Sequence, residues 1–150
     1  MAEPAPRSPE VKVAVSPEPL DVAAALSQAS DPECGGLGVF VGTVRATPAV
    51  TGSGEVKRLD YDVHDELAST SLNEIATEAA SRWDLRKVLA LHRSGRCAVG
   101  DVTVIVACAA PHRTDALEAC RFIIDEVKTK VPIWKREVYE DGSTWLEPHA

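Results

Sequence analysis

The chain has 150 residues, of which 45% are hydrophobic and 26% are charged, and its formal net charge is -7. This length suits one domain with a sizeable core. The acidic balance and the aromatic content of 5% argue against a general nucleic-acid-binding protein, which needs a basic face and stacking side chains.

The first third of the chain begins with a polar segment. Residues 1–10 are rich in proline, alanine and charge, so we predict a disordered tail before a single domain over 11–150. Valines that alternate with other residues predict a short strand over 11–15. The Ala/Leu-rich segment 20–30 predicts a helix. The β-branched run 37–44 predicts a core strand.

The rest of the chain alternates loops, strands and two longer helices. Residues 46–54 predict a flexible loop, because glycine, serine and threonine dominate them. A strand is predicted over 55–63, and apolar residues at helical spacing predict an amphipathic helix over 65–83. Thr114 suits the N-cap of a second long helix that ends near Lys130. Further strands are predicted over 87–91, 96–99, 102–109, 133–139 and 143–147, the last two joined by a turn at Asp141-Gly142.

This order of elements predicts the fold class. Pairs of strands separated by single helices are typical of α+β proteins with largely antiparallel sheets. We therefore predict one α+β domain with about three helices and one or two largely antiparallel sheets.

The cysteines bear on the compartment. Cys34, Cys97, Cys108 and Cys120 form no CxxC pair, and their spacing fits neither a zinc finger nor a small disulfide framework. Cys108 and Cys120 lie in apolar runs and are predicted to be core residues, whereas Cys34 and Cys97 lie near glycines and are predicted to be partly exposed. Free thiols favour a reducing compartment. Because we find neither a signal-like apolar segment nor a run of membrane-spanning length, we expect a cytoplasmic protein.

The segment 111–137 concentrates cations on this acidic background. A cluster of cations focuses a positive potential on one place and predicts an anionic ligand, such as a phosphate or a carboxylate. The cationic side chains of the segment are His112, Arg113, Arg121, Lys128, Lys130, Lys135 and Arg136.

His112 and Arg113 stand between a predicted buried strand and the start of a helix. Backbone N–H groups at a helix N-terminus attract anions, and an imidazole and a guanidinium there reinforce the attraction. A solvated turn, with the histidine packed on the strand end, is the alternative.

Lys128 and Lys135 flank the end of the same helix. Neighbouring cations, and partial burial by Ile133 and Trp134, predict a lowered pKa for Lys135, which would let it donate a proton near neutral pH. The alternative for Lys128 is a lysine that merely suits the helix dipole. Arg45 follows an apolar strand and precedes the flexible loop, a reasonable position for a ligand clamp.

Two histidines are set aside as metal ligands. Neither His64 nor His92 has a second ligand four residues away, and we expect neither a metal nor a bound cofactor.

Several motifs together resemble a known family. In chain order they are LGVFVGTVR, LDYD, SRWDL, HRSGRCAVGD, PHRTDALEACRFIIDEVK and VPIWKRE. From about Gly35 to Glu147 the chain resembles the large, catalytic subunit of molybdopterin synthase. The combination of the His-Arg segment with PIWKRE makes the resemblance specific.

The resemblance implies an activity and an assembly. Members of this family are α+β homodimers, and each copy receives the C-terminal Gly-Gly thiocarboxylate tail of a small ubiquitin-like partner, which makes a heterotetramer. Sulfur passes from that tail to cyclic pyranopterin monophosphate and builds the molybdopterin dithiolene. Two sulfurs are needed, so two partner molecules are consumed for each product.

The resemblance also implies roles for individual residues. Lys128 and Lys135 are expected to be catalytic as well as substrate-binding. The thiocarboxylate is itself the nucleophile, so the enzyme has to hold two anions together and protonate leaving oxygens. The residues expected to bind substrate are Arg45, His112, Arg113, Lys128, Lys135, Arg136 and Glu137.

Some positions depart from the family pattern. His64 stands where an aromatic residue is frequent, Thr43 where a basic residue is, and Ala110-Pro111 where a serine precedes the His-Arg pair. The loop 46–54 is rich in Gly, Thr and Ser instead of His and Asn. These departures concern substrate-loop contacts and leave the cations of the site intact.

Two alternatives to the enzyme remain. A non-catalytic module would use the same groove only to dock a ubiquitin-like partner, and the intact cations argue against it. A general phosphate or nucleic-acid binder is disfavoured by the acidic charge. For the homodimer interface, residues 97–109 and the hairpin over 134–147 are the candidate surfaces.

Overall fold

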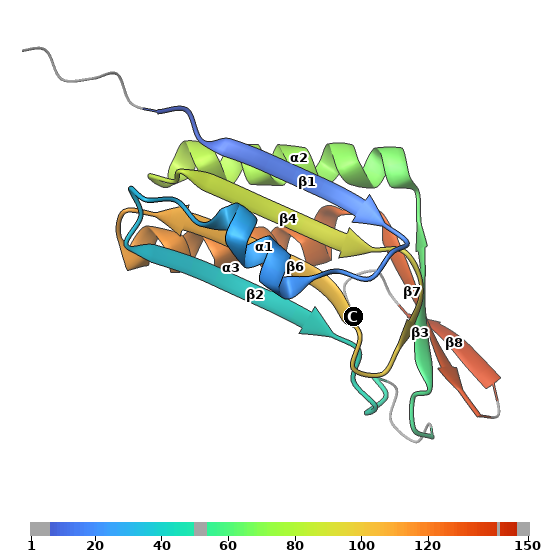
Figure 1. The fold of residues 1–150 in the computed structure, drawn as a ribbon. Helices are drawn as coiled ribbons and strands as arrows, with labels where there is room; N and C mark the ends of the chain where they lie inside the picture. The colour runs from blue at the N-terminus through green and yellow to red at the C-terminus, as the bar shows by residue number, and fades with distance from the viewer. Residues whose placement is uncertain (1–6, 50–53, 141, 147–150) are drawn as a thin grey trace, which may run out of the picture.

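The apolar runs of the chain build two four-stranded sheets and three helices in an α+β fold (Figure 1). The computed structural model describes residues 7–49, 54–140 and 142–146. The helices are α1 (Val22–Ala29), α2 (Asp65–Arg82) and α3 (Arg113–Lys130). The strands are β1 (Glu10–Ser16), β2 (Gly36–Thr43), β3 (Arg58–Val63), β4 (Lys87–Arg93), β5 (Gly95–Ala98), β6 (Val102–Ala110), β7 (Ile133–Tyr139) and β8 (Gly142–Leu146).

The larger apolar strands form the first sheet, in the order β1-β4-β6-β2. β1 runs parallel to β4, and the other two pairings are antiparallel. Helix α1 covers one face of this sheet, and α2 and α3 cover the other (Figure 1). Because β6 is central and covered on both faces, nearly all of its side chains are buried, which explains its continuous apolar sequence.

The two long helices bury one stripe each. In α2 the buried residues are Ala68, Leu72, Ile75, Ala76 and Ala79, and in α3 they are Ala116, Ala119, Cys120, Ile123, Ile124 and Val127. Both sets recur at the spacing of one helix face. In Figure 1, α3 runs along the sheet from the end of β6 on the left to the start of β7 on the right.

The second sheet has the order β5-β3-β7-β8 and is antiparallel throughout. Successive side chains of a strand point to opposite faces. In β7, Ile133 and Glu137 are therefore buried on the inner face, while Trp134 on the outer face is 48% exposed. The inner face of this sheet meets the C-terminal end of α3 and forms the candidate site.

Glycines let α3 lie directly against β2. A Cβ on Gly38 would stand 2.4 Å from the carbonyl oxygen of Ala116, and a Cβ on Gly36 would stand 3.0 Å from Cα of Arg113. Any side chain at Gly38 would therefore push the helix away. These glycines at the start of β2 set the distance between the N-terminal half of α3 and the sheet.

The predicted fold class is confirmed: the described residues form one α+β domain with three helices and two mostly antiparallel sheets. The expected cap of α3 was wrong, because the helix begins at Arg113 with His112 as its N-cap instead of Thr114. Cys97 was expected to be partly exposed, yet it is fully buried in β5, where it pairs with Leu59 of β3; Cys34 is partly exposed, and Cys108 and Cys120 are core residues as predicted.

Parts of the other predictions fall outside the described residues. The tail over 1–10 lies mostly there; within its described part, Arg7 forms an ion pair with Asp31 at 2.7 Å and β1 begins at Glu10. Residues 50–53 of the loop 46–54, and Asp141 of the predicted turn, also lie outside. Among the described helices, none is long and apolar enough to span a bilayer.

Candidate active site

A cavity of about 540 Å³ opens where the end of β2, the inner face of β3 and β7, and the last turn of α3 meet. A smaller pocket of about 40 Å³ adjoins it. Both are lined by Tyr61, Thr103, Val104, Lys128 and Lys135, so they are two parts of one hollow. Arg45, Ala49 and Glu137 complete the charged and loop side of the larger cavity.

Lys135 lies at the junction of the two parts. Its strand position is fixed between Tyr61 of β3 and Leu146 of β8. Burial lowers the pKa of Lys135, the ammonium of Lys128 and the guanidinium of Arg45 lower it further, and the carboxylate of Glu137 partly opposes them. The predicted direction of the Lys135 pKa is therefore confirmed, and the shift brings proton release closer to neutral pH.

The predicted cause of that burial was partly wrong. Ile133 does line the small pocket with Lys135. Trp134 lies on the opposite face of β7, where it and Trp145 line a separate surface hollow. The residues that enclose Lys135 come from β3, β6 and α3 instead.

Lys128 and Arg45 bring two more cations to the same cavity. Lys128 lies in the last turn of α3, and Arg45 follows the end of β2. Both side chains are exposed, and both contribute to the wall of the larger cavity. Three cations from three separate elements thus face one hollow, which suits an anionic ligand.

Glu137 is a buried carboxylate beside these cations, with 4% exposure. Its two oxygens accept hydrogen bonds from the backbone N–H of Ala49, at 3.2 and 3.1 Å, and Oε1 accepts another from the Tyr139 hydroxyl at 2.7 Å. Glu137 therefore ties the loop after Arg45 to β7.

Tyr61, Thr103 and His92 form the deeper wall of the hollow. The Tyr61 ring meets the His92 ring edge-on, with centroids 5.2 Å apart and planes at 79°. Burial raises the pKa of Tyr61 to about 12, although a hydrogen bond with Thr103 opposes the shift. Tyr61 therefore remains protonated at physiological pH.

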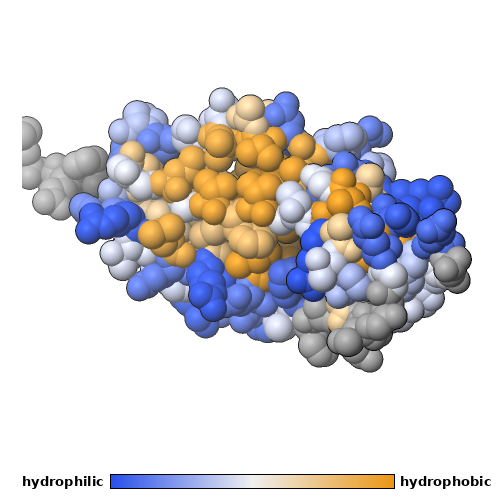
Figure 2. Space-filling model, turned by 90° about the horizontal axis from the view of Figure 1, so that it is seen from below, coloured by the Kyte–Doolittle hydropathy of each residue, from blue (hydrophilic) through white to orange (hydrophobic). Residues whose placement is uncertain are grey.

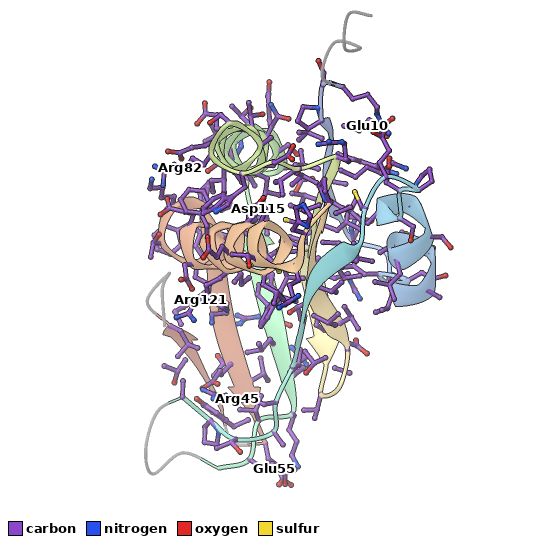
Figure 3. All side chains as sticks on the ribbon, turned by 90° about the vertical axis from the view of Figure 1, so that its left-hand side faces the viewer. Glu10, Arg45, Glu55, Arg82, Asp115 and Arg121 are labelled. Carbon is purple, nitrogen blue, oxygen red and sulfur yellow. The ribbon has the colours of Figure 1, made fainter. Side chains whose placement is uncertain are left out.

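His112 and Arg113 lie at the other end of α3. Both are exposed, at the junction between β6 and the helix that the sequence predicted. Lys128 follows Arg113 by fifteen residues of the same helix, which corresponds to about 22 Å along its axis. Figure 3 also places Asp115, in the first turn of α3, well away from Arg45.

Arg136 points away from the cavity. On the outer face of the second sheet it donates to a carboxylate oxygen of Asp60 at 2.7 Å, and its guanidinium lies 5.3 Å from the ring centroid of Trp145. Arg58 shares Asp60 at 2.9 Å. Arg121 is also remote, because it pairs with Asp125 on the surface of α3.

The structure thus brings together Arg45, Lys128, Lys135 and Glu137 and leaves His112, Arg113 and Arg136 elsewhere in the same chain. Sequence reasoning missed Tyr61 and Thr103 and set aside His92. One signal was available: Thr103 lies inside the apolar strand β6, and His92 directly follows the apolar run 88–91 of β4. A buried polar residue needs a reason.

Comparisons with known proteins agree on the family. A family model described as MoaE protein matches residues 15–130. Two curated relatives are named molybdopterin synthase catalytic subunit. The one from Arabidopsis thaliana is 39% identical over 85% of this chain and 63% of its own length. The one from Pyrococcus abyssi is 37% identical over 92% of this chain and 91% of its own length. The chain belongs to the MoaE protein family.

Solved structures support this membership. Molybdopterin synthase from Staphylococcus aureus is 31% identical, with a TM-score of 0.82 over 89% of this chain and 96% of that one. A chain of the complex of subunits 1 and 2 of molybdopterin-converting factor from Helicobacter pylori is 21% identical, with a TM-score of 0.71 over 91% and 90%, and shows the fold alone. The chain spans less than two thirds of the Arabidopsis relative, and the family's curated members are named as enzyme subunits.

Proposed function

We propose that this protein is the catalytic subunit of a molybdopterin synthase, which transfers sulfur from a partner's C-terminal thiocarboxylate to cyclic pyranopterin monophosphate. One observation carries the proposal: Arg45, Lys128 and Lys135 come from three elements of a MoaE family chain to line one cavity of about 540 Å³. Both reactants are anions, and a cavity with three cations suits them.

The residues take separate roles in this chemistry. The thiocarboxylate sulfur is the nucleophile and forms a new C–S bond as a C–O bond of the substrate breaks. Water then hydrolyses the resulting thioester and releases the partner with an ordinary carboxylate, so the enzyme supplies charge and protons. Arg45 clamps the phosphate-bearing substrate, and Lys128 lies beside the partner's terminal glycine. Lys135, with its lowered pKa, donates the proton that a departing oxygen needs. We propose that Glu137 acts on the substrate through the loop that it holds, because its oxygens already accept from Ala49 and Tyr139.

The partner is a small ubiquitin-like subunit. The Helicobacter pylori complex of subunits 1 and 2 supports a small-subunit partner. An extended Gly-Gly tail is narrow enough to enter a cavity between sheet and helix, and its terminal anion would meet Lys128 and Lys135 there. Since two sulfurs are transferred for each product, two partner molecules are used in turn.

A homodimer reconciles the two groups of cations. A small substrate cannot touch both Lys128 and Arg113 of one chain, about 22 Å apart along α3. In a symmetric dimer, the His112–Arg113 pair of one copy serves the cavity of the other, and two partner chains complete a heterotetramer.

An apolar area on β2 supports this assembly. Figure 2 shows it on the face seen from below, where β2 is the free edge of the first sheet. Leu37, Val39 and Phe40 of this strand are each more than a third exposed. The β6 part of the segment 97–109 is not available for an interface, because β4 and β2 pair with both of its edges. The β7–β8 hairpin remains a second candidate surface.

The cytoplasm is the proposed location. Cys34, Cys97, Cys108 and Cys120 are all free thiols, which suit a reducing compartment.

The test is reconstitution. The purified protein is mixed with a thiocarboxylated small subunit and cyclic pyranopterin monophosphate, and molybdopterin is measured in a single turnover. A partner ending in an ordinary carboxylate is the control and should give no product. If the thiocarboxylated partner binds but no sulfur leaves it, the chain is the non-catalytic docking module instead.

A further inference from the structure

His92 is a buried histidine whose ring lines the same small pocket as Lys128 and Lys135. It lies near the end of β4 and is 7% exposed. The chemistry described above gives it no role, since it does not line the larger cavity. A polar ring at this depth, beside two functional lysines, calls for an explanation.

The contacts of the ring fix its tautomer. Nδ1 lies 2.6 Å from the backbone carbonyl oxygen of Arg93. A carbonyl oxygen only accepts, so Nδ1 must carry the proton. The Tyr61 ring packs edge-on against the imidazole and holds its plane. In the neutral form the other nitrogen, Nε2, then offers a lone pair and no proton.

The surroundings keep this ring neutral. Burial lowers the pKa of His92 to about 4, the hydrogen bond to Arg93 opposes the shift, and the charges of Lys128 and Lys135 lower the pKa further. The titratable or charged side chains that line the hollow with His92 are Lys128 from α3, Lys135 and Glu137 from β7, Arg45 after β2 and Tyr61 from β3, while β6 contributes only Thr103 and Val104.

We propose that His92 is a positioning residue for the two lysines: its Nε2 accepts a hydrogen bond from a lysine ammonium, directly or through one water molecule in the shared pocket. The pocket of about 40 Å³ has room for such a water. This role rests on the sulfur-transfer function proposed above. A neutral acceptor steadies the protonated lysine that burial disfavours, whereas a charged histidine would add one more cation to the cluster.

The first test measures the protonation of the two ring nitrogens of His92. The wild-type protein, with ¹⁵N-labelled histidine, is studied by NMR from pH 5 to 8 without any substrate. His92 should show a protonated Nδ1 and an unprotonated Nε2 throughout the range. A ring protonated at Nε2, or one that titrates near pH 6, would overturn the proposal.

The second test measures the lysine pKa in variants of His92. His92→Phe fills the site but removes the acceptor, and His92→Gln restores one. The matched control is His64→Asn, which changes an exposed histidine at the N-cap of α2. With ¹³C-labelled lysine, the pKa of Lys135 should fall by about one unit in His92→Phe, as expected for a lost hydrogen bond to a charged group. It should fall by less than about half a unit in His92→Gln. Unchanged lysine pKa values in His92→Phe would rule out the positioning role.

The third test measures the rate of sulfur transfer and its pH dependence. The rate should fall in His92→Phe with an unchanged KM for substrate, and the alkaline loss of rate should begin about one pH unit lower, because the proton donor loses its proton earlier. His92→Gln should recover most of the rate. If the wild type shows no turnover at all, the proposed function fails, while the two NMR measurements still decide the role of His92. If His92→Phe does not fold, the protonation of the His92 ring in the wild type still decides it.

Discussion

The two ends of α3 carry cations in different settings. At the C-terminal end, Lys128 shares an enclosed hollow with Lys135 and Arg45, and burial lowers the pKa of Lys135. At the N-terminal end, His112 and Arg113 are exposed beside the free edge of the first sheet. A segment that looks like one cationic cluster in the sequence is therefore two clusters in space. The difference teaches that burial at the C-terminal end favours proton release from Lys135, whereas the N-terminal end presents exposed cations to solvent.

The largest expected effect is at the enclosed end. Lys128→Ala should lower the rate of sulfur transfer by at least roughly 100-fold, because it removes a charge next to both reactants. Single-turnover kinetics measure the rate, and circular dichroism checks the fold. Lys130→Ala is the matched control, since Lys130 is exposed and pairs with Glu126. A Lys128→Ala protein with wild-type rate would remove the catalytic assignment.

The open end is tested by a double variant. His112→Ala/Arg113→Ala should weaken substrate binding by about 100-fold, which is the scale of lost charge-assisted hydrogen bonds, and should leave partner binding intact. Calorimetry of each ligand measures both affinities. An equal loss of both would point to a folding defect.

Mixing the two variants, at a substrate concentration too low for the double variant to bind it, sharpens the comparison. If the ends act across a dimer, a mixed dimer of Lys128→Ala with the double variant contains one complete site, and random mixing should restore about a quarter of the wild-type activity. If both ends act within one chain, the mixture should stay inactive.

Lys135→Arg asks whether a fixed charge is enough at the enclosed end. Arginine keeps the charge but does not release its proton in this range. We expect substrate binding to persist and the rate to fall at least roughly tenfold. Full rate in this variant would reduce Lys135 to a fixed positive charge.

Glu137→Ala should loosen the loop that follows Arg45. It leaves the N–H of Ala49 and the hydroxyl of Tyr139 without their acceptor, at a cost of about 1–3 kcal/mol in the free energy of unfolding. Chemical denaturation measures that cost, and hydrogen exchange at Ala49 should speed up. Slow exchange at Ala49 in the variant would show that another contact holds the loop.

The smallest effect concerns stability and pH. Because the pKa of Lys135 is lowered in the fold, the unfolded chain binds its proton more readily, so the native state loses stability as the pH falls from above 10.5 through the folded pKa. Lys135→Met removes this cost and should stabilise the protein at neutral pH by about 0.5 kcal/mol. Thermal unfolding at pH 7 and at pH 10 measures it, and a gain that did not shrink at the higher pH would contradict the linkage.

Much of the fold could be predicted from the sequence. The helical spacing in α2 and α3 and the β-branched runs of β2 and β6 depend on local burial, which leaves a period in the sequence. The parallel pairing of β1 with β4 and the division into two sheets could not be predicted, because pairing partners leave no local pattern. The N-cap moved to His112 because the strand β6 runs on to Ala110 and the helix follows at once.

The candidate site could be predicted only where the residue type itself indicates the chemistry, as it does for charged side chains. Cations stand out in an acidic chain, so Arg45, Lys128 and Lys135 were found. Their neighbours were not: Tyr61 and Thr103 reach the pocket through strand alternation and sheet packing, which the sequence does not display. Arg136 was expected to bind substrate together with Lys135. It follows Lys135 by one residue in β7, so its side chain points to the outer face of the sheet and not into the cavity.

The length of α3 acts as a ruler. Gly36 and Gly38 hold its first turns against β2, and its last turn delivers Lys128 to the cavity. One residue more in the helix would carry that lysine 1.5 Å further along the axis and rotate it by about 100° away from Lys135. An insertion or deletion inside α3 would therefore move Lys128 relative to the cavity, whereas the same change in a surface loop would leave that lysine in place.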